Sequence, residues 1–230
     1  LGKGFPADIE ARVTRAIGLC DRLVVSTEPL AAAYGRHAAE TVVAPNLLDD
    51  AVWGPLRAQP NDSPRLRVGW AGSASHGGDL TLLEEVIRAT ATQVDWVFMG
   101  FCPPALKSLL REVHPPVAVK DYPAALAGLR LDVAVAPLAA NAFNEAKSNL
   151  KLLEYGALGY PVVCSNILPY QGGLPVVRVA NTPQQWLSAL RRLLADREER
   201  ETLGTALREA VRANWMIDAR RAEWLAAWTR

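Results

Sequence analysis

Short apolar runs alternate with helical runs from Leu66 onward, and this alternation limits the possible folds more than any other feature of the chain. Amphipathic segments such as LTLLEEVIRATA lie between the apolar runs. Strands that alternate with helices are joined by right-handed crossovers and form a parallel sheet. We expect six strands, which begin near residues 66, 95, 117, 132, 161 and 175. The predicted fold class is α/β, with a doubly wound (Rossmann-like) parallel sheet.

The other expected elements are mostly helices. Residues 7–20 form an amphipathic helical pattern, and RLVVST (22–27) is a short strand candidate. A second helix is expected at about residues 29–37, with Ser26 or Thr27 as its cap. PALKSLLREV (104–113) is another helical run, and the last three helices are expected at about 183–195, 198–213 and 218–229.

The stretch from Pro45 to Pro64 contains further prolines and turn-forming polar residues such as Asn61 and Asp62. This composition is typical of a linker or a surface loop. We therefore expect a domain boundary near residue 60, a main domain at 61–215 and a separate C-terminal helix at 216–230.

Charge and cysteine usage exclude several classes of partner. The chain has 25 basic and 24 acidic side chains, so its net charge of +1 gives no electrostatic case for nucleic acid or an acidic membrane surface. Its cysteines, at 20, 102 and 164, are odd in number and far apart, which argues against a disulfide framework and a structural zinc. The first ten residues lack signal-peptide features, and no apolar run reaches the roughly 18 residues of a membrane span. We expect a cytoplasmic protein with no integral membrane segment, no bound metal and no cofactor.

The stretch KSNLKLLEYGALGYPVVCS (147–165) predicts a loop, a helix, a tight turn and a buried strand. Glu154 lies inside the helix. In open parallel sheets, ligands are bound by loops beyond the carboxyl ends of strands and by the first turns of the following helices. By pattern alone, an exposed glutamate on a helix face is the simplest interpretation of Glu154. A carboxylate also suits a ribose diol, because it accepts hydrogen bonds from two adjacent hydroxyls.

Two turns could bind phosphate. The first, GWAGSASHGGDL (69–80), is rich in glycine and precedes a helix, but it is neither a strict Rossmann fingerprint nor a Walker loop and could be an ordinary turn. The second precedes the helix that carries Glu154, where Ser148 or Asn149 is the expected cap and the amides of Asn149, Leu150 and Lys151 would point at an anion. Lys147 could add positive charge, but by pattern alone the preferred interpretation of Lys147 and Lys151 is that of solvated lysines beside a capped helix.

The stretch at 147–165 resembles the donor-binding segment of nucleotide-sugar glycosyltransferases with the GT-B fold, of the retaining "group 1" type. In that family, a helix with a glutamate leads into a small-Gly-x-Pro-Val-Val turn and strand. Here Glu154 is followed by Ala157 to Gly159 and then by Pro161 to Val163. PYQGG (169–173) also matches the loop after the donor strand. The resemblance covers roughly residues 20–230 and is strongest from 132 to 173.

The resemblance implies roles for individual residues. The second glutamate of the family's Glu, seven residues, Glu motif holds the ribose hydroxyls, and Glu154 occupies that position. The first glutamate is replaced by Ala146, and Glu145 lies one place early. In the glycine-rich turn the family often has a Lys-Gly pair that reaches the diphosphate, whereas this chain has His76 and Gly77. We hypothesise that Lys147 compensates for the missing lysine; a solvated loop histidine is the alternative for His76.

The resemblance also implies which residues bind the nucleotide. The nucleobase is expected in a slot lined by Val119, Lys120 and Tyr122, together with Gly100 and Phe101. Besides Gly100 and Phe101, the expected donor-binding residues of the two phosphate turns, the ribose position and the base slot are Gly72, Ser73, His76, Gly77, Lys147, Ser148, Asn149, Leu150, Glu154, Val119, Lys120 and Tyr122. No catalytic residue can be named.

The expected function is that of a donor-binding domain of a metal-independent glycosyltransferase of the hexosyltransferase type. It would transfer a sugar from a nucleotide diphosphate sugar to a saccharide or lipid-linked acceptor in surface polysaccharide synthesis, and the full-length protein could be peripheral at the inner membrane. Residues 1–60 would end an N-terminal acceptor domain, and the last helix would cross back to that domain. A complete enzyme needs about twice this length, so an incomplete, inactive fragment is expected.

Two alternatives remain open at this stage. Ala146 favours a non-catalytic or degenerate nucleotide-binding GT-B module. An NAD-dependent oxidoreductase or epimerase is weakened by the absent fingerprint and by the missing Tyr-x-x-x-Lys pair.

Overall fold

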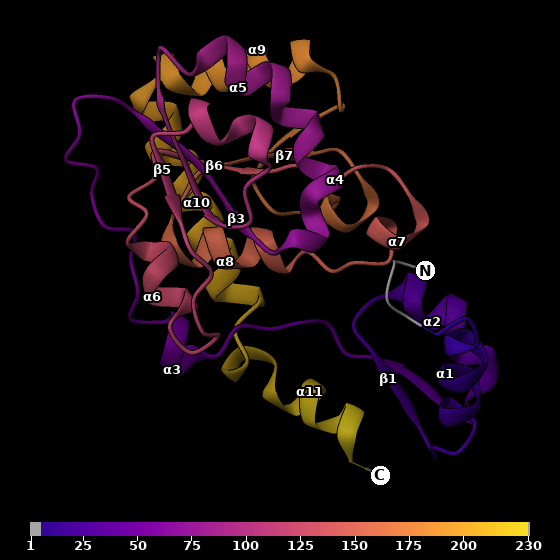
Figure 1. The fold of residues 1–230 in the computed structure, drawn as a ribbon. Coiled ribbons are helices and arrows are strands. Elements are labelled where there is room, and N and C mark those ends of the chain that lie inside the picture. The colour runs from indigo at the N-terminus through magenta and orange to yellow at the C-terminus, as the bar shows by residue number, and fades with distance from the viewer. Residues whose placement is uncertain (1–5, 230) are drawn as a thin grey trace.

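Six parallel strands form the central sheet in the computed structural model, which describes residues 6–229 (Figure 1). They are β3 (Arg67–Gly72), β4 (Asp95–Gly100), β5 (Glu112–His114), β6 (Val133–Ala136), β7 (Val162–Ser165) and β8 (Val177–Val179). Their order across the sheet is β5-β4-β3-β6-β7-β8, and each neighbouring pair is parallel. This arrangement confirms the expected doubly wound α/β fold. The strand order reverses between β3 and β6, so the topological switch point lies beyond the carboxyl ends of these two strands.

Helices cover both faces of this sheet (Figure 1). The α-helices are α1 (Ile9–Ile17), α2 (Glu28–Tyr34), α3 (Asp50–Trp53), α4 (Gly77–Leu80), α5 (Glu84–Thr90), α6 (Tyr122–Ala127), α7 (Ala142–Glu145), α8 (Leu150–Leu158), α9 (Pro183–Ala195), α10 (Arg197–Asn214) and α11 (Arg221–Trp228). Short 3₁₀ turns occupy residues 35–37, 74–76, 81–83, 104–109, 168–170 and 218–220. The expected helix at 183–195 is confirmed to the residue, and those at 198–213 and 218–229 agree within one or two residues.

Alternate residues of each strand enter two separate cores, as the two-residue period of a strand requires. On β3 and β4, Trp70 and Phe98 face the layer of α5 and α9, whereas Ala71 and Val97 face the layer of α6, α8 and α10. Both faces are thus buried, which explains why the strands are apolar runs without a polar face.

Two glycines fix the close packing of α8 on α10. An added Cβ at Gly156 would lie 2.8 Å from Leu207, and one at Gly204 would lie 2.3 Å from the Gly159 carbonyl oxygen. Gly159 itself ends α8 in the left-handed conformation, with φ +85°. These contacts hold α8 in a defined position, which matters because α8 carries Glu154.

The prediction of a strand beginning near residue 117 and of a helix over 104–113 is wrong. The strand that pairs with β4 at the edge of the sheet is β5, Glu112–His114. Only a 3₁₀ turn precedes it, at Pro104–Leu109. His114 precedes Pro115, and a residue before proline is pushed out of the helical region into extended backbone. Proline also lacks an N–H for a sheet ladder, so the strand ends there and residues 115–121 form a loop.

The N-terminal residues form a small unit of their own. β1 (Leu23–Val25) and β2 (Thr41–Val43) pair in parallel, and α1 and α2 lie beside them. Thr27 caps α2, as expected, by accepting from the Leu30 N–H. The expected helix at 7–20 is shorter, at Ile9–Ile17, and the expected helix at 29–37 divides into α2 and a 3₁₀ turn.

The last helix returns to this N-terminal unit. Arg22 donates hydrogen bonds to the carbonyl oxygens of Ala226, Ala227 and Thr229. Figure 1 shows α11 leaving the main body and running toward β1. The domain boundaries expected at residues 60 and 215 stay predictions, and residues 1–5 and 230 lie outside the described part of the chain.

No helix within residues 6–229 is long and apolar enough to cross a membrane. The same residues contain no group of three or more His, Cys, Asp or Glu side chains that could hold a metal ion.

Candidate functional site

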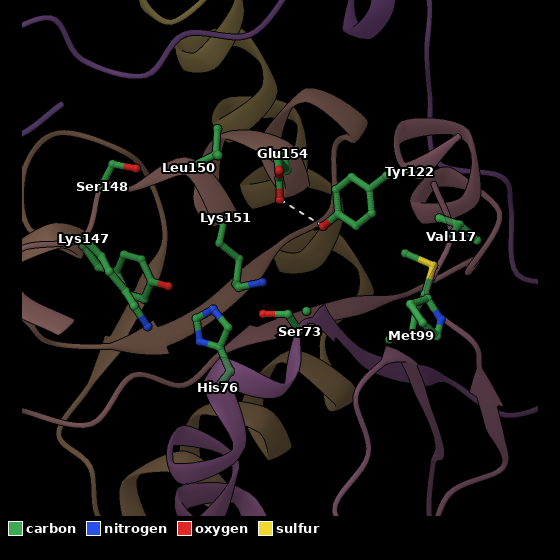
Figure 2. A pocket seen from close by; sticks show the side chains of 14 residues that line it. Ser73, His76, Met99, Val117, Tyr122, Lys147, Ser148, Leu150, Lys151 and Glu154 are labelled. Atoms are coloured by element: carbon green, nitrogen blue, oxygen red, sulfur yellow. Dashed lines mark hydrogen bonds between the residues drawn. The ribbon is translucent and has the colours of Figure 1, made fainter. Parts of the chain in front are cut away.

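A cavity of about 410 Å³ lies at the switch point, beyond the carboxyl ends of β3 and β4 and against the first turns of α8 (Figure 2). Its walls come from the turn after β3, the end of β4, the loop after β5, α6, α8 and the 3₁₀ turn after β7. The lining residues are Gly72, Ser73, His76, Met99, Gly100, Pro116, Val117, Tyr122, Lys147, Ser148, Leu150, Lys151, Glu154 and Tyr170.

Most of the residues expected to bind a ligand line this one cavity. They are Gly72, Ser73, His76, Gly100, Tyr122, Lys147, Ser148, Leu150 and Glu154. The fold therefore brings the two candidate phosphate turns and the helix glutamate together, although Gly72 and Glu154 are far apart in the sequence.

Five expected residues do not line the cavity: Gly77, Phe101, Val119, Lys120 and Asn149. Val119 is 90% exposed and Lys120 is exposed, because the loop after β5 turns outward where a strand was expected. Pro116 and Val117 line the cavity in their place. Gly77 lies against the Phe101 ring, since an added Cβ there would be 3.3 Å from it. Asn149 is the N-cap of α8, but its side chain makes no capping hydrogen bond and it lines a neighbouring groove.

Glu154 is held by a tyrosine across the cavity. The Tyr122 hydroxyl donates to Glu154 Oε2 over 3.0 Å, as Figure 2 shows. Burial raises the pKa of Glu154, an effect opposed by the nearby Lys151 and by the Tyr122 hydrogen bond. The exposed helix-face interpretation of Glu154 is wrong, because this side chain lines the cavity and is only partly exposed. One carboxylate oxygen is fixed by Tyr122, and Oε1 keeps its acceptor capacity.

Lys151 was not among the expected side-chain ligands, yet its ammonium lies at the centre of the cavity (Figure 2). It donates to the Ala71 carbonyl oxygen, at the end of β3, and lies over the rings of Trp70 and Tyr155 at 5.4 Å and 5.8 Å from their centroids. The Tyr155 hydroxyl accepts from the Ala71 N–H over 3.0 Å. Burial lowers the pKa of Lys151, and the charge of Glu154 opposes this shift. Two side chains of α8 thus satisfy both backbone groups of Ala71 and fix the start of the glycine-rich turn.

Asp79 joins the glycine-rich turn to the loop after β6. It is buried in α4, where Oδ2 lies 2.8 Å from His76 Nδ1. Its Oδ1 accepts from the Ala139 N–H at 2.9 Å and from Asn144 Nδ2 at 2.8 Å. Burial raises the pKa of Asp79, but the hydrogen bonds and the nearby Lys147 outweigh burial, so the net shift is downward. This carboxylate fixes the positions of both phosphate turns relative to each other.

Lys147 lies at the opposite end of the cavity from the apolar residues Met99 and Val117 (Figure 2). Its Nζ is 3.8 Å from Asp79 Oδ2 and 4.8 Å from the centroid of the Phe143 ring. This nitrogen is buried and has no hydrogen-bond partner among the described residues. Burial lowers the pKa of Lys147, and Asp79 opposes the shift. A buried ammonium without an acceptor is costly, so this position suits an anionic ligand.

A second groove of about 790 Å³ continues from this end of the cavity, because Lys147 and Ser148 line both. It runs between the N-terminal unit and the loop after β7, and apolar residues such as Pro29, Leu174 and Trp215 form part of its wall. Two hydrogen bonds join the sides: Thr27 Oγ1 donates to the Ala146 carbonyl oxygen over 2.9 Å, and Asn46 Nδ2 donates to Ser148 Oγ over 2.7 Å.

Comparisons with known proteins agree with this architecture. Residues 81–226, well over half of the 230-residue chain, match a family described as glycosyl transferase-like. No curated protein matches the sequence.

Several solved structures are similar. HepE of Anabaena, in complex with UDP and glucose, has a TM-score of 0.72 at 14% identity, over 96% of this chain and 67% of HepE. TarM of S. aureus has a TM-score of 0.69 at 12% identity, over 100% of this chain and 48% of TarM. Sucrose-phosphate synthase of Thermosynechococcus elongatus has a TM-score of 0.69 at 17% identity, over 97% of this chain and 63% of that enzyme.

At these identities the likeness shows the fold, and the expected GT-B, Rossmann-like architecture is confirmed. The chain spans about half to two thirds of the length of these structures.

Proposed function

The chain belongs to the glycosyl transferase-like family, and on that premise we propose that it forms the donor-binding domain of a glycosyltransferase that takes a sugar from a nucleotide diphosphate sugar. The family match supports sugar transfer as the reaction class. HepE, a protein of the same fold, has been solved in complex with UDP and glucose and with UDP-glucose. These complexes support a nucleotide sugar as the donor.

One observation carries this proposal: a single cavity has a buried carboxylate, Glu154, in its middle and a buried ammonium without a hydrogen bond, Lys147, at one end. The two hydroxyls of a ribose can donate hydrogen bonds to the carboxylate, and the oxygens of a diphosphate can accept them from the ammonium. An apolar wall at the other end, formed by Met99, Pro116 and Val117, suits the face of a nucleobase. A nucleoside diphosphate presents these three groups in the same order.

The proposed chemistry is electrostatic. Negative charge grows on the leaving diphosphate as the glycosidic bond breaks, and preorganised positive groups stabilise that charge. Lys147 supplies a cation at this end of the cavity, and Ser73 and the amides at the start of α8 add donors. His76 donates through Nε2 if Asp79 holds its Nδ1–H tautomer. No metal is required for these contacts, and the donor is a substrate, not a cofactor.

The acceptor is proposed to enter through the second groove, which meets the cavity at Lys147 and Ser148. Its mixed apolar and amide lining, which includes Trp215, Asn46 and Gln171, suits a saccharide or a lipid-linked saccharide. We propose synthesis of a surface polysaccharide as the pathway, with the protein in the cytoplasm or peripheral at the inner membrane. We propose that an acceptor domain completes this groove, so the isolated chain is expected to bind donor with little or no turnover.

A non-catalytic nucleotide-binding module is the second candidate. Ala146 stands where the family motif has its first glutamate, and its carbonyl oxygen is engaged by Thr27. A chain that binds donor but never transfers sugar would fit this arrangement.

Calorimetric titration of the chain with UDP, GDP, ADP and NAD tests the proposal. We expect one nucleoside diphosphate to bind with 1:1 stoichiometry and NAD not to bind; binding of NAD alone rejects the donor-binding role and favours an oxidoreductase. Sugar transfer from the corresponding donor, measured with the full-length protein, then separates the enzyme from the non-catalytic module.

A further inference from the structure

Two lysines line the candidate cavity at different depths. Lys151 lies on the second residue of α8, three residues before Glu154, so both side chains extend from the same helix face. Lys147 precedes the helix and lies beside Asp79 and Phe143, next to the second groove. Figure 2 shows Lys151 between Glu154 and His76, and Lys147 beyond His76.

Neither ammonium is saturated by the protein. Each lysine can donate three hydrogen bonds. Within residues 6–229, Lys151 donates only to the Ala71 carbonyl oxygen, and Lys147 donates to no acceptor, since Asp79 Oδ2 is 3.8 Å away. Buried ammonium groups lose hydration, so the remaining donors favour a ligand with anionic oxygens.

The order of side chains along the cavity indicates which phosphate of a bound nucleoside diphosphate would lie at each lysine. In a nucleoside diphosphate, the phosphate attached to the ribose is the inner one and the second phosphate is the outer one. A ribose bound by Glu154 places the inner phosphate at the next position along the cavity, where Lys151 and Ser73 lie. The outer phosphate then falls at Lys147, from which the second groove begins.

We propose that the two lysines divide the diphosphate between them, Lys151 binding the inner phosphate and Lys147 the outer one. This inference rests on the proposed function. It makes Lys151 a donor-binding residue in its own right, and it explains how the site holds a diphosphate although histidine occupies position 76.

A purely structural role for Lys151 is the competing explanation, because its hydrogen bond to Ala71 supports the glycine-rich turn. The two explanations differ in what they predict for ligands with fewer phosphates. A structural defect weakens binding of the nucleoside alone, whereas loss of a phosphate ligand leaves nucleoside binding unchanged.

The test is a titration series with three ligands, for the base that binds best among UDP, GDP and ADP: the nucleoside, its monophosphate and its diphosphate. The variants are Lys151→Met, Lys147→Met and, as a matched control, Lys107→Met, which removes an exposed lysine outside the cavity. Lys151→Gln is included because it keeps a donor for the Ala71 carbonyl oxygen without the charge, in case Lys151→Met does not fold.

Lys151 variants are expected to bind the monophosphate and the diphosphate about tenfold to a hundredfold more weakly and the nucleoside normally. Lys147→Met is expected to weaken only the diphosphate, by about tenfold, and Lys107→Met is expected to change binding of none of the three ligands. The proposal that each lysine binds one phosphate would be overturned by either of two results. One is that Lys151→Gln loses as much affinity for the nucleoside as for the diphosphate; the other is that Lys147→Met loses affinity for the monophosphate. If the wild type binds no nucleoside diphosphate, the proposed function fails and this inference fails with it.

Discussion

Tyr122 Oη lies 3.0 Å from Glu154 Oε2, and this hydrogen bond joins the start of α6 to the middle of α8 across the cavity. Tyr122 also packs edge-on against Trp53 of α3, with ring centroids 6.4 Å apart. The carboxylate is therefore held in one orientation by a side chain that is itself anchored in the core. This orientation leads to the first two predictions.

Tyr122→Phe removes the hydroxyl and keeps the ring contact with Trp53. Without its donor, the carboxylate of Glu154 is less well oriented and one buried oxygen loses a partner. We expect affinity for the preferred nucleoside diphosphate to fall about three- to tenfold, equivalent to about 0.5–1.5 kcal/mol. Calorimetry measures this change, and tighter binding by the variant would show that Tyr122 competes with the ligand for Glu154.

Glu154→Gln replaces one strong acceptor with an amide of the same shape. A ribose diol that donates to Glu154 should lose about 1.5–3 kcal/mol of binding free energy, because a hydrogen bond to a charged group is lost. The 2′,3′-dideoxy form of the same diphosphate lacks both hydroxyls and should bind the wild type and the variant about equally. If Glu154→Gln weakens both ligands to the same extent, Glu154 does not contact the ribose.

The Arg67–Glu112 pair makes a pH-dependent contribution to stability. Arg67 is buried at the start of β3, and two of its nitrogens lie 2.8 Å from the two carboxylate oxygens of Glu112. Hydrogen bonding to Arg67 lowers the pKa of Glu112 from 4.5 to about 2. A depressed folded-state pKa stabilises the protein above the unfolded value, and this contribution is lost as the pH falls from about 4.5 toward 2.

Glu112→Gln is therefore expected to lower the free energy of unfolding at pH 7 by about 1–2 kcal/mol, less than for a fully buried pair because the Glu112 side chain is 36% exposed. Denaturant titration at several pH values checks this. The difference between wild type and variant should shrink as the pH falls below about 4.5, and a constant difference would contradict the assignment.

Gly204→Ala tests the packing that positions α8. The added Cβ would lie 2.3 Å from the Gly159 carbonyl oxygen, so α10 or the end of α8 must shift. We expect a loss of about 1–3 kcal/mol in the free energy of unfolding. Gly78→Ala is the control, because nothing lies within 4 Å of its added Cβ and the change should stay below about 1 kcal/mol. Equal effects of both substitutions would argue against close packing of α8 on α10.

The parallel sheet could be predicted from sequence because each buried strand is a continuous apolar run. The exception is β5, whose Glu112 and His114 are polar and whose neighbour is Pro115. VAVKD resembles a buried strand more closely, but the two prolines before it displace the chain from the sheet. β5 lies at the edge of the sheet, where a short polar strand is tolerated.

The candidate site could be predicted in part. The turn after β3 lies at a strand end, and Lys147 and Glu154 lie on the segment that follows β6, so topology alone brings them together. Val119 is predicted in the base slot because a strand is expected there, but residues 115–121 form a loop and Val119 is exposed. Lys151 has a sequence signal, since it lies three residues before Glu154 on one helix face, but lysine in a first helical turn is more often solvated.

Asp79 shows a limit of pattern reasoning. Near a helix start an aspartate is usually a solvated residue that favours the helix dipole, and here it is a buried acceptor for three partners. Two of these partners, Ala139 and Asn144, are sixty or more positions away in the sequence, so no local pattern identifies them.

The most direct test is a crystal structure of the chain with the tightest-binding nucleoside diphosphate. We predict the ribose hydroxyls at Glu154, the base against Met99 and Val117, and the two phosphates within hydrogen-bond distance of the amines of Lys151 and Lys147. A nucleotide bound outside this cavity, or bound in it with the ribose away from Glu154, would contradict the account.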